Sequence, residues 1–196
     1  MNKSSWRKKT TAKILTISRL RKAIRELDGL AIGLVGFSGS FAKNGRTDAE
    51  SVTRRFIETM LANTDETLPR RPLFLISGAT DLGVPRIGYA AAKKLGVTSV
   101  GVTSQEALKY SIAELEYLTV VGNKFGDESE AFVSVIDELW VIGGGKQSLS
   151  ECNLASEAGV KIMIAQGIGG IADTLSDATL EARYTNIDQY LLENGG

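Results

Sequence analysis

The residues best suited to chemistry lie in one stretch, 141–151, which reads Val-Ile-Gly-Gly-Gly-Lys-Gln-Ser-Leu-Ser-Glu. An apolar run that ends near Gly143 predicts a buried strand, and the glycines after it leave the backbone uncovered. Ser148 and Glu151 have the Ser-x-x-Glu spacing of a capping box, which predicts that a helix begins at Ser148. Backbone N–H groups then gather at the positive end of a helix dipole. This arrangement suits an anion, most often a phosphate.

The composition limits the chemistry that is available. The chain has no histidine, and Cys152 is its single cysteine. These counts exclude Ser-His and Cys-His nucleophilic systems, histidine-ligated metals and intrachain disulfides, and no metal site is expected. Catalysis would use carboxylates, Lys, Arg, Tyr, Ser or bound water. With no base visible beside it, Cys152 is expected to pack rather than to act as a nucleophile. No run of about 18 apolar residues exists, so we expect no membrane span and a cytoplasmic location.

From Leu30 onward, apolar runs alternate with helical patterns. Continuous apolar strands with helices between them predict an α/β fold, Rossmann-like and doubly wound, with a mostly parallel sheet and helices on both faces. The expected strands cover residues 31–37, 73–77, 97–102, 117–121, 139–143 and 161–165. The expected helices cover 83–95, 105–113, 148–158 and 188–193, with two more beginning at a Thr47–Glu50 capping box and near Asp127.

Residues 1–28 are expected to form a basic N-terminal extension, and residues 29–196 the nucleotide-binding domain. The extension has nine Lys or Arg and two Asp or Glu. Apolar residues at helical spacing from about Thr11 predict an amphipathic helix docked on the domain. A targeting sequence or a contact with nucleic acid or a membrane surface are alternatives, although no aromatic residue beyond Trp6 supports nucleic-acid binding.

Small and polar residues follow several predicted strands, where a parallel sheet binds its ligands. Tight turns in such sheets also need glycine for purely structural reasons. A G-x-G-x-x-G dinucleotide fingerprint and a P-loop are both absent. Lys146 offers either a point charge to a phosphate or a solvated side chain. The candidate ligand- and phosphate-binding residues are Gly36, Ser38, Gly39, Ser40, Gly78, Thr80, Gly83, Gly143, Gly144, Gly145, Lys146, Gln147, Ser148, Gly169 and Gly170.

Three further polar residues have two interpretations each. Asp81 and Asp173 either line the same rim or cap their own turns, as Asp in a glycine-rich turn commonly does. Arg86 either reaches a phosphate or is an exposed helical arginine.

Residues 143–151 resemble the Pro-Gly-Gly-x-Gly-Thr-x-x-Glu motif of the LONELY GUY proteins, which are often misannotated as lysine decarboxylases. Their superfamily includes molybdenum-cofactor carrier-like proteins and ligand-sensing domains. Residues 36–40 and 77–84 look like the first and second glycine turns of the family. Residues 161–173, with Gly169-Gly170-Ile171-Ala172-Asp173, look like the corresponding strand and turn of the carrier-like branch. The resemblance covers about residues 30–175.

The resemblance implies a Rossmann-like domain, commonly dimeric, that binds a nucleotide or a nucleotide-derived ligand. In the enzymatic branch it implies hydrolysis of the N-glycosidic bond of a nucleoside 5′-monophosphate. Glu151 matches the catalytic glutamate, which would stabilise an oxocarbenium-like centre or activate water, and Ser148 matches the phosphate-binding threonine. Gly143 replaces the proline of the motif and Gln147 its third glycine. The arginine that the enzymes carry on the preceding helix is missing, and residues 127–130 read Asp-Glu-Ser-Glu there.

Three hypotheses follow. The first is binding of a nucleotide-derived phosphorylated ligand at the carboxyl rim of the sheet, by a homodimer or higher homo-oligomer and without nucleic acid. The second is a phosphoribohydrolase with Glu151 as its catalytic residue; Glu151 as a capping-box carboxylate is the structural alternative. The third is a structural module that binds a partner through its basic N-terminal helix.

Overall fold

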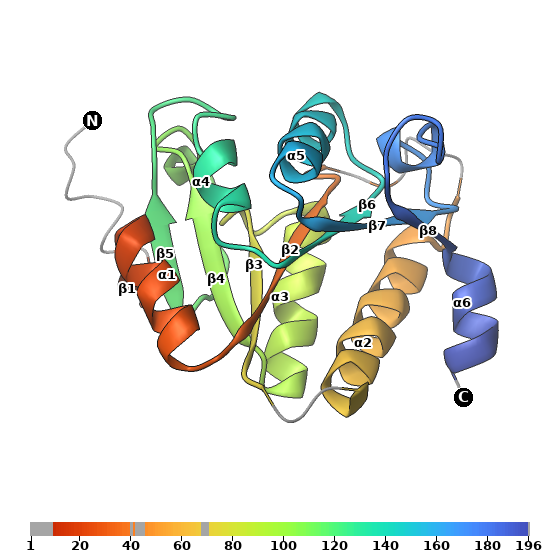
Figure 1. Cartoon of the computed structure of the whole chain (residues 1–196), viewed down its shortest axis with the longest axis horizontal. Helices are drawn as coiled ribbons and strands as arrows, with labels where there is room; N and C mark the ends of the chain where they lie inside the picture. The colour runs from red at the N-terminus through yellow and green to blue at the C-terminus, as the bar shows by residue number, and fades with distance from the viewer. Residues whose placement is uncertain (1–9, 40, 42–45, 68–70, 196) are drawn as a thin grey trace.

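The computed structural model describes residues 10–39, 41, 46–67 and 71–195. Its centre is a sheet that contains eight strands within these residues, in the order β1-β5-β4-β3-β2-β6-β7-β8 (Figure 1). Every neighbouring pair in the sheet is parallel. The predicted α/β Rossmann-like class is therefore confirmed. The strands are β1 (Lys13–Ile14), β2 (Leu30–Gly36), β3 (Leu73–Ser77), β4 (Thr98–Thr103), β5 (Tyr117–Val120), β6 (Glu138–Ile142), β7 (Lys161–Gln166) and β8 (Arg183–Asn186).

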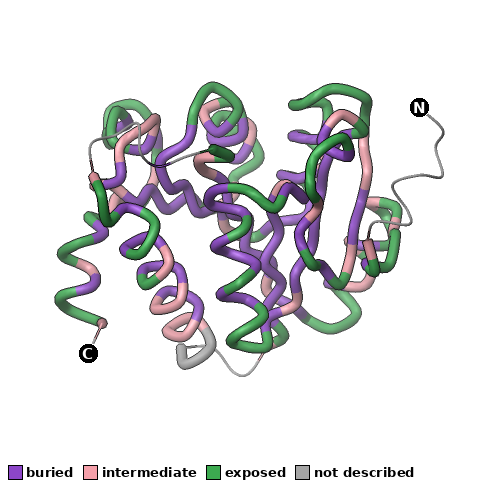
Figure 2. The backbone as a smooth tube through the Cα atoms, turned by 180° about the vertical axis from the view of Figure 1, so that it is seen from behind, coloured by how far each residue is buried: buried purple, intermediate pink, exposed green. Residues whose placement is uncertain are grey.

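Helices cover both faces of the sheet, because the central strands carry apolar side chains on each side. In β2, for example, Ile32 and Leu34 belong to one buried cluster and Ala31 and Val35 to the other. The helices are α1 (Ile17–Glu26), α2 (Ala49–Thr67), α3 (Gly83–Leu95), α4 (Ser129–Val133), α5 (Lys146–Glu157) and α6 (Ile187–Asn194). Buried residues of α2, α3 and α6 pack in the first cluster, and those of α1, α4 and α5 in the second. Figure 2 shows the resulting buried strands between helices that are exposed on their outer sides.

The chain reverses its direction across the sheet between β2 and β6. From β2 it moves through β3 and β4 to β5, whereas from β6 it moves outward in the opposite sense through β7 to β8. The two switch strands are directly paired, and Gly36 lies beside Ile142 at their carboxyl ends. Helices on opposite sides diverge at such a point and leave a crevice there, where open α/β sheets bind their ligands.

Both edge strands are short and were not expected from the sequence. Lys13–Ile14 pairs with β5, and Arg183–Asn186 pairs with β7. The first amphipathic helix therefore begins at Ile17 rather than near Thr11, after Thr16, whose side chain accepts a hydrogen bond from the Arg19 N–H. Leu20 and Ile24 of this helix are buried in the core of the sheet.

Two further helices differ from expectation. The expected helix over residues 105–113 is only a 3-10 turn, Ala107–Lys109, followed by an isolated antiparallel bridge between Ile112 and Thr80. Helix α2 begins at Ala49, and its Glu50 carboxylate accepts hydrogen bonds from Arg54 and Arg86 instead of closing the expected box with Thr47.

Candidate functional site

A cavity of about 510 Å³ opens at the carboxyl ends of β2 and β6, at the switch point of the sheet. Its size lies within the range of roughly 300–1,000 Å³ that is usual for small-molecule sites. It is lined by the turn after β2, the ends of β3 and β4, the N-terminus of α4 and the first turns of α5. Segments far apart in the sequence therefore meet at one edge of the sheet.

The glycine turn after β6 is held open by its backbone conformation. Gly143 and Gly144 have φ angles of +66° and +89°, which favour glycine. A Cβ on Gly143 would lie 2.2 Å from a ring carbon of Phe37, so Gly143 packs behind the cavity wall. At Gly39, Gly78 and Gly145, an added Cβ would meet no atom within 4 Å. These three glycines line the cavity with open space in front of them.

Helix α5 presents its N-terminus to the cavity. Its N-cap is Gly145, which makes no side-chain capping hydrogen bond. No described residue accepts a hydrogen bond from the backbone N–H of Lys146, Gln147 or Ser148. These three residues line the cavity. Unsatisfied N–H groups at the positive end of a 12-residue helix are suited to an anion, and anion binding here stays a prediction.

The predicted capping box is wrong, because the helix begins at Lys146 and Ser148 already lies inside it. The Glu151 carboxylate therefore does not cap the helix together with Ser148. It accepts hydrogen bonds from Ser129 Oγ at 3.1 Å and from Gln147 Nε2 at 3.2 Å, both on Oε1. Ser129 belongs to α4, so the carboxylate is positioned by an element 22 residues away.

A second buried carboxylate stands beside Glu151. Gln147 Nε2 also donates to Glu128 Oε1, at 3.3 Å, and Glu128 Oε2 accepts from the Gly126 N–H at 2.9 Å. Glu128 is 5% exposed and Glu151 6%, and both line the cavity. Burial, assisted by the charge of Glu128, raises the pKa of Glu151 to about 7. Burial likewise raises the pKa of Glu128.

The cavity lining therefore combines two electrostatic characters. It includes the N–H groups at the start of α5 and two buried carboxylates, both of which accept from the side chain of Gln147 in the first turn of the same helix. Among the described residues, Lys146 is the single Lys or Arg that lines the cavity. Glu128 is the N-cap residue of α4, the helix that carries an arginine in the enzymes resembled by the sequence.

The structure brings most of the predicted site residues together. The cavity is lined by Gly36, Ser38, Gly39, Gly78, Thr80, Gly144, Gly145, Lys146, Gln147, Ser148 and Glu151. It does not bring Gly83, Gly143, Gly169 and Gly170 to the lining, and Ser40 falls outside the described residues.

The glycines that do not line the cavity hold its wall in place. A Cβ on Gly83 would meet the Phe37 carbonyl oxygen, and a Cβ on Gly170 would meet the carbonyl oxygen of Gly144 at 2.7 Å. The segment after Gly170 also supports the glycine turn, since the Ile171 N–H donates to the Gly144 carbonyl at 3.1 Å. These positions are glycine because backbone segments approach closely there.

Sequence reasoning missed several lining residues. Glu128 was noted only because no arginine stands near it, and its burial could not be read from a polar stretch. Phe37, Phe125 and Phe132 also line the cavity. Phe125 is 45% exposed and packs against Tyr110, with ring centroids 5.9 Å apart.

The remaining candidates have structural roles. The Asp173 carboxylate accepts from the N–H groups of Gly167 and Gly169, each at 2.8 Å, so it caps its own turn. Arg86 forms an ion pair with Glu50 at 2.7 Å and does not line the cavity, and neither does Asp81. Cys152 is buried, and burial raises the pKa of its thiol to about 12, as suits a packing residue.

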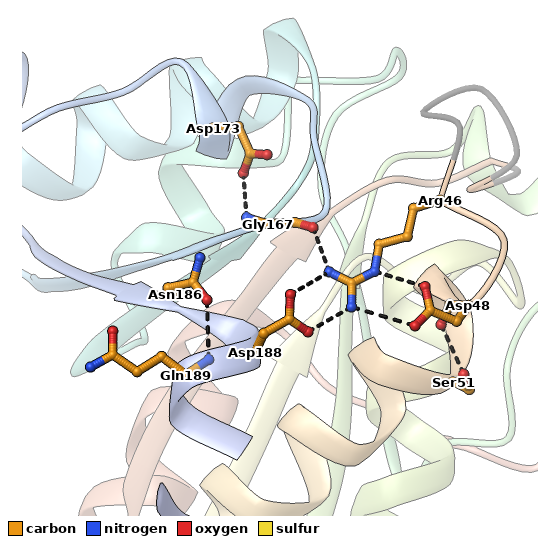
Figure 3. Close-up of polar contacts among 8 residues, drawn as sticks. All are labelled: Arg46, Asp48, Ser51, Gly167, Asp173, Asn186, Asp188 and Gln189. Carbon is orange, nitrogen blue, oxygen red and sulfur yellow. Dashed lines mark hydrogen bonds and ion pairs between the residues drawn. The ribbon is translucent and has the colours of Figure 1, made fainter. Parts of the chain in front are cut away.

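A cluster of polar contacts is centred on Arg46, directly before α2 (Figure 3). Arg46 donates to both carboxylate oxygens of Asp188, at 2.6 and 2.9 Å, and to the Gly167 carbonyl at 2.8 Å. Its Nε donates to Asp48 at 2.8 Å. The hydrogen bonds to Asp188 and Asp48 raise the pKa of Arg46 and lower those of both carboxyl groups. The cluster joins the segment before α2 to the end of β7 and the start of α6.

Solved structures share this arrangement of strands and helices. The molybdenum cofactor carrier protein from Chlamydomonas reinhardtii matches with a TM-score of 0.61 at 18% identity, covering 84% of this chain and 95% of that one. The chain has the fold of the molybdenum cofactor carrier proteins. The molybdenum cofactor binding protein from Rippkaea orientalis matches with a TM-score of 0.62 at 15% identity, covering 84% and 94%. The structural-genomics target TM1055 matches with a TM-score of 0.64 at 18% identity, covering 84% and 97%.

The predicted resemblance to the carrier-like branch is thus confirmed at the level of the fold.

No family model and no curated protein sequence matches the chain. Within the described residues, no cluster of three or more Cys, Asp or Glu side chains could hold a metal ion. None of the described helices combines the length and the apolar character needed to cross a bilayer.

Proposed function

We propose that the protein binds a nucleotide-derived, phosphorylated ligand in the cavity at the switch point. The observation that carries the proposal is the open N-terminus of α5, whose three N–H groups have no acceptor among the described residues and which faces a cavity of about 510 Å³. A phosphate placed there gains hydrogen bonds and the favourable end of the helix dipole. The carrier-like fold supports the same class of ligand, since two structural neighbours are named for binding or carrying the molybdenum cofactor.

The glycines at the cavity provide a direct test. An alanine at Gly145 adds one methyl group to open space at the phosphate side, where φ is −139° and imposes no left-handed strain. Isothermal titration calorimetry with AMP, GMP, ADP-ribose and inorganic phosphate should detect binding of at least one nucleotide to the wild type. The Gly145→Ala variant should bind that nucleotide at least tenfold more weakly without losing thermal stability. Absence of binding for every probe would refute the proposal.

A second candidate function is hydrolysis of a nucleoside 5′-monophosphate, favoured by the burial of Glu151 and its pKa of about 7. A carboxyl group with a pKa near the working pH is suited to general acid–base catalysis. Chromatography of free base after incubation with the common nucleoside monophosphates tests this candidate. Release that is lost in Glu151→Gln would support it, and no release from any of them would count against it.

Two assembly hypotheses remain predictions. The homodimer implied by the family resemblance is tested by the mass in solution, measured by light scattering. The role of the basic N-terminal segment as a partner-binding element is tested by deleting residues 1–28, although α1 and β1 pack on the sheet and their loss should also reduce stability.

A further inference from the structure

Two buried carboxylates share one hydrogen-bond donor at the start of α5. Gln147 Nε2 donates to Glu128 Oε1 at 3.3 Å and to Glu151 Oε1 at 3.2 Å. Both glutamates are more than nine-tenths buried, and both line the cavity. The two oxygens therefore lie close together with little exposure to water, where two like charges are held only at a high cost. The arrangement favours a pair that keeps one proton between its two carboxyl groups.

The charged groups on α4 and α5 do little to offset this repulsion. On the side of α4, Asp127 precedes Glu128 and adds a further negative charge, although its carboxylate accepts from two backbone N–H groups of its own turn. On the side of α5, Lys146 is exposed and forms no ion pair with either glutamate, and the thiol of Cys152 is buried. The single Lys or Arg of the described cavity lining is thus directed to solvent rather than paired with the carboxylates.

The other described elements packed against α5 bring no positive charge to the pair either. The charged residues of β6 and β7, Glu138 and Lys161, stand at the first position of each strand, whereas the cavity opens at the carboxyl ends. Asp173, in the 3-10 turn Ile171–Asp173, accepts from the N–H groups of Gly167 and Gly169. Binding of a proton is therefore the means by which the pair relieves its repulsion.

An anion at the start of α5 would increase the repulsion. Gln147 belongs to both sites, because its side chain donates to the two carboxylates and its backbone N–H is one of the three that have no acceptor among the described residues. A phosphate held by these N–H groups therefore lies near the pair, and its charge disfavours the ionised form of both carboxyl groups. Protonation of one carboxylate removes part of that repulsion.

We infer that the Glu128–Glu151 pair is a proton-binding site that takes up one proton from solvent when an anionic ligand binds at the start of α5. The inference rests on the proposed function, since the anion is the phosphate of that ligand. Glu151 Oε2 receives the proton, because no described residue donates to it, whereas Oε1 accepts from Ser129 and Gln147. An ionised carboxylate only accepts hydrogen bonds, but the protonated group has an O–H that can donate to an anionic oxygen.

Proton uptake makes the affinity for the anion depend on pH. Burial, with a smaller contribution from the charge of Glu128, raises the pKa of Glu151 to about 7, and a bound anion raises it further. Below this pH the free protein already holds the proton, so binding takes up none. Above this pH each bound anion brings a proton with it, and the dissociation constant should rise by up to about tenfold per pH unit.

Calorimetric titration of the full chain with AMP, GMP, ADP-ribose and sulfate tests the inference. The charge of each probe is nearly constant between about pH 7 and pH 8.5, because the second pKa of a phosphate monoester is about 6. Titrations at about pH 8 in HEPES and in Tris, which differ in ionisation enthalpy, give the number of protons taken up. We expect about 0.5 to 1 proton per bound probe, and binding at least about fivefold weaker at pH 8.5 than at pH 7.

Matched variants assign the proton to the pair. Glu151→Gln is neutral at every pH, so it should take up less than about 0.2 proton and bind at pH 8.5 at least about fivefold more tightly than the wild type. Glu128→Gln removes the neighbouring charge and should shift both quantities in the same direction, so the test remains available if one variant folds poorly. Glu130→Gln is the control, since Glu130 is exposed on α4 and does not line the cavity, and it should follow the wild type.

The outcomes separate this inference from the proposed function. Binding without proton uptake in the wild type, or uptake that persists in both Glu151→Gln and Glu128→Gln, overturns the inference. Weaker binding by Glu151→Gln at pH 8.5 overturns it as well. If a nucleotide binds without a proton and Gly145→Ala weakens it, the phosphate site stands and only the proton site fails. If none of the probes binds, both proposals fail.

Discussion

Arg46 and Asp188, 142 positions apart in the sequence, are joined by two hydrogen bonds of 2.6 and 2.9 Å. The same guanidinium donates to the carbonyl of Gly167, so one side chain links the segment before α2 to the end of β7 and the start of α6 (Figure 3). A planar guanidinium holds a carboxylate with both geometry and charge, which a lysine cannot reproduce. The cluster therefore anchors residues 46–48, directly before α2, to the other end of the sheet.

The Arg46→Met substitution should loosen this segment. Because Asp188 is about half exposed, we expect a modest loss of about 1 kcal/mol in the free energy of unfolding. Thermal unfolding measures it. Lys93→Met removes a fully surface pair with Glu114 and should lower stability less. A melting temperature of Arg46→Met equal to that of Lys93→Met would show that the cluster contributes nothing beyond an ordinary surface pair.

The raised pKa of Glu151 predicts a pH dependence of stability. The folded protein binds this proton more tightly than the unfolded chain, since the pKa is about 7 in the fold and 4.5 ordinarily. The resulting stabilisation is complete below the ordinary pKa and is lost as the pH rises through about 7. Wild-type stability should therefore fall between pH 5 and pH 8 by about 1 to 3 kcal/mol.

Chemical denaturation of Glu151→Gln at both pH values isolates this contribution. The variant cannot ionise at this position, so its stability should decline less than that of the wild type over the same interval. Glu130→Gln serves as the exposed control and should follow the wild type. A wild-type stability that rises from pH 5 to pH 8 would contradict the buried, weakly acidic Glu151.

Two glycines of the cavity region should respond differently to alanine. Gly78 lines the cavity, its Cβ would meet nothing within 4 Å, and its φ is not left-handed. Gly78→Ala should change the free energy of unfolding by less than about 1 kcal/mol. Gly143→Ala should destabilise the protein by about 2 to 4 kcal/mol, because φ is +66° and the methyl group meets Phe37.

Urea unfolding of the two variants gives the comparison. The nucleotide affinity of Gly78→Ala should also be measured. A methyl group in the cavity should weaken nucleotide binding while the fold persists. Equal destabilisation by both alanines would mean that the space in front of Gly78 is not open.

Cys152 should resist thiol reagents in the native protein. Its side chain is fully buried, and burial raises its pKa to about 12, so little thiolate forms near pH 8. We expect iodoacetamide to label it at least a hundredfold more slowly in buffer than in denaturant. Mass spectrometry over time measures both rates. Rapid labelling of the folded protein would instead indicate a reactive cysteine.

The sequence alone determined the architecture and most of the cavity rim. Apolar runs such as residues 31–37 and 73–77 have no polar face, so they must be covered on both sides, and that requirement predicts a parallel sheet. The glycine turn at 143–145 directly follows such a run, so it could be predicted from neighbouring residues alone. Local patterns did not predict the two edge strands. The two-residue strand β1 and the polar strand β8 have too few apolar residues to give a strand pattern.

The environment of Glu151 was decided only by the tertiary structure. The local pattern favoured a capping box, but the helix begins at Lys146, and Ser129, Glu128 and Gln147 surround the carboxylate instead. Ser129 and Glu128 come from another helix. Sequence spacing predicts which residues share one helix, whereas burial and charge pairing depend on which helices the sheet brings together.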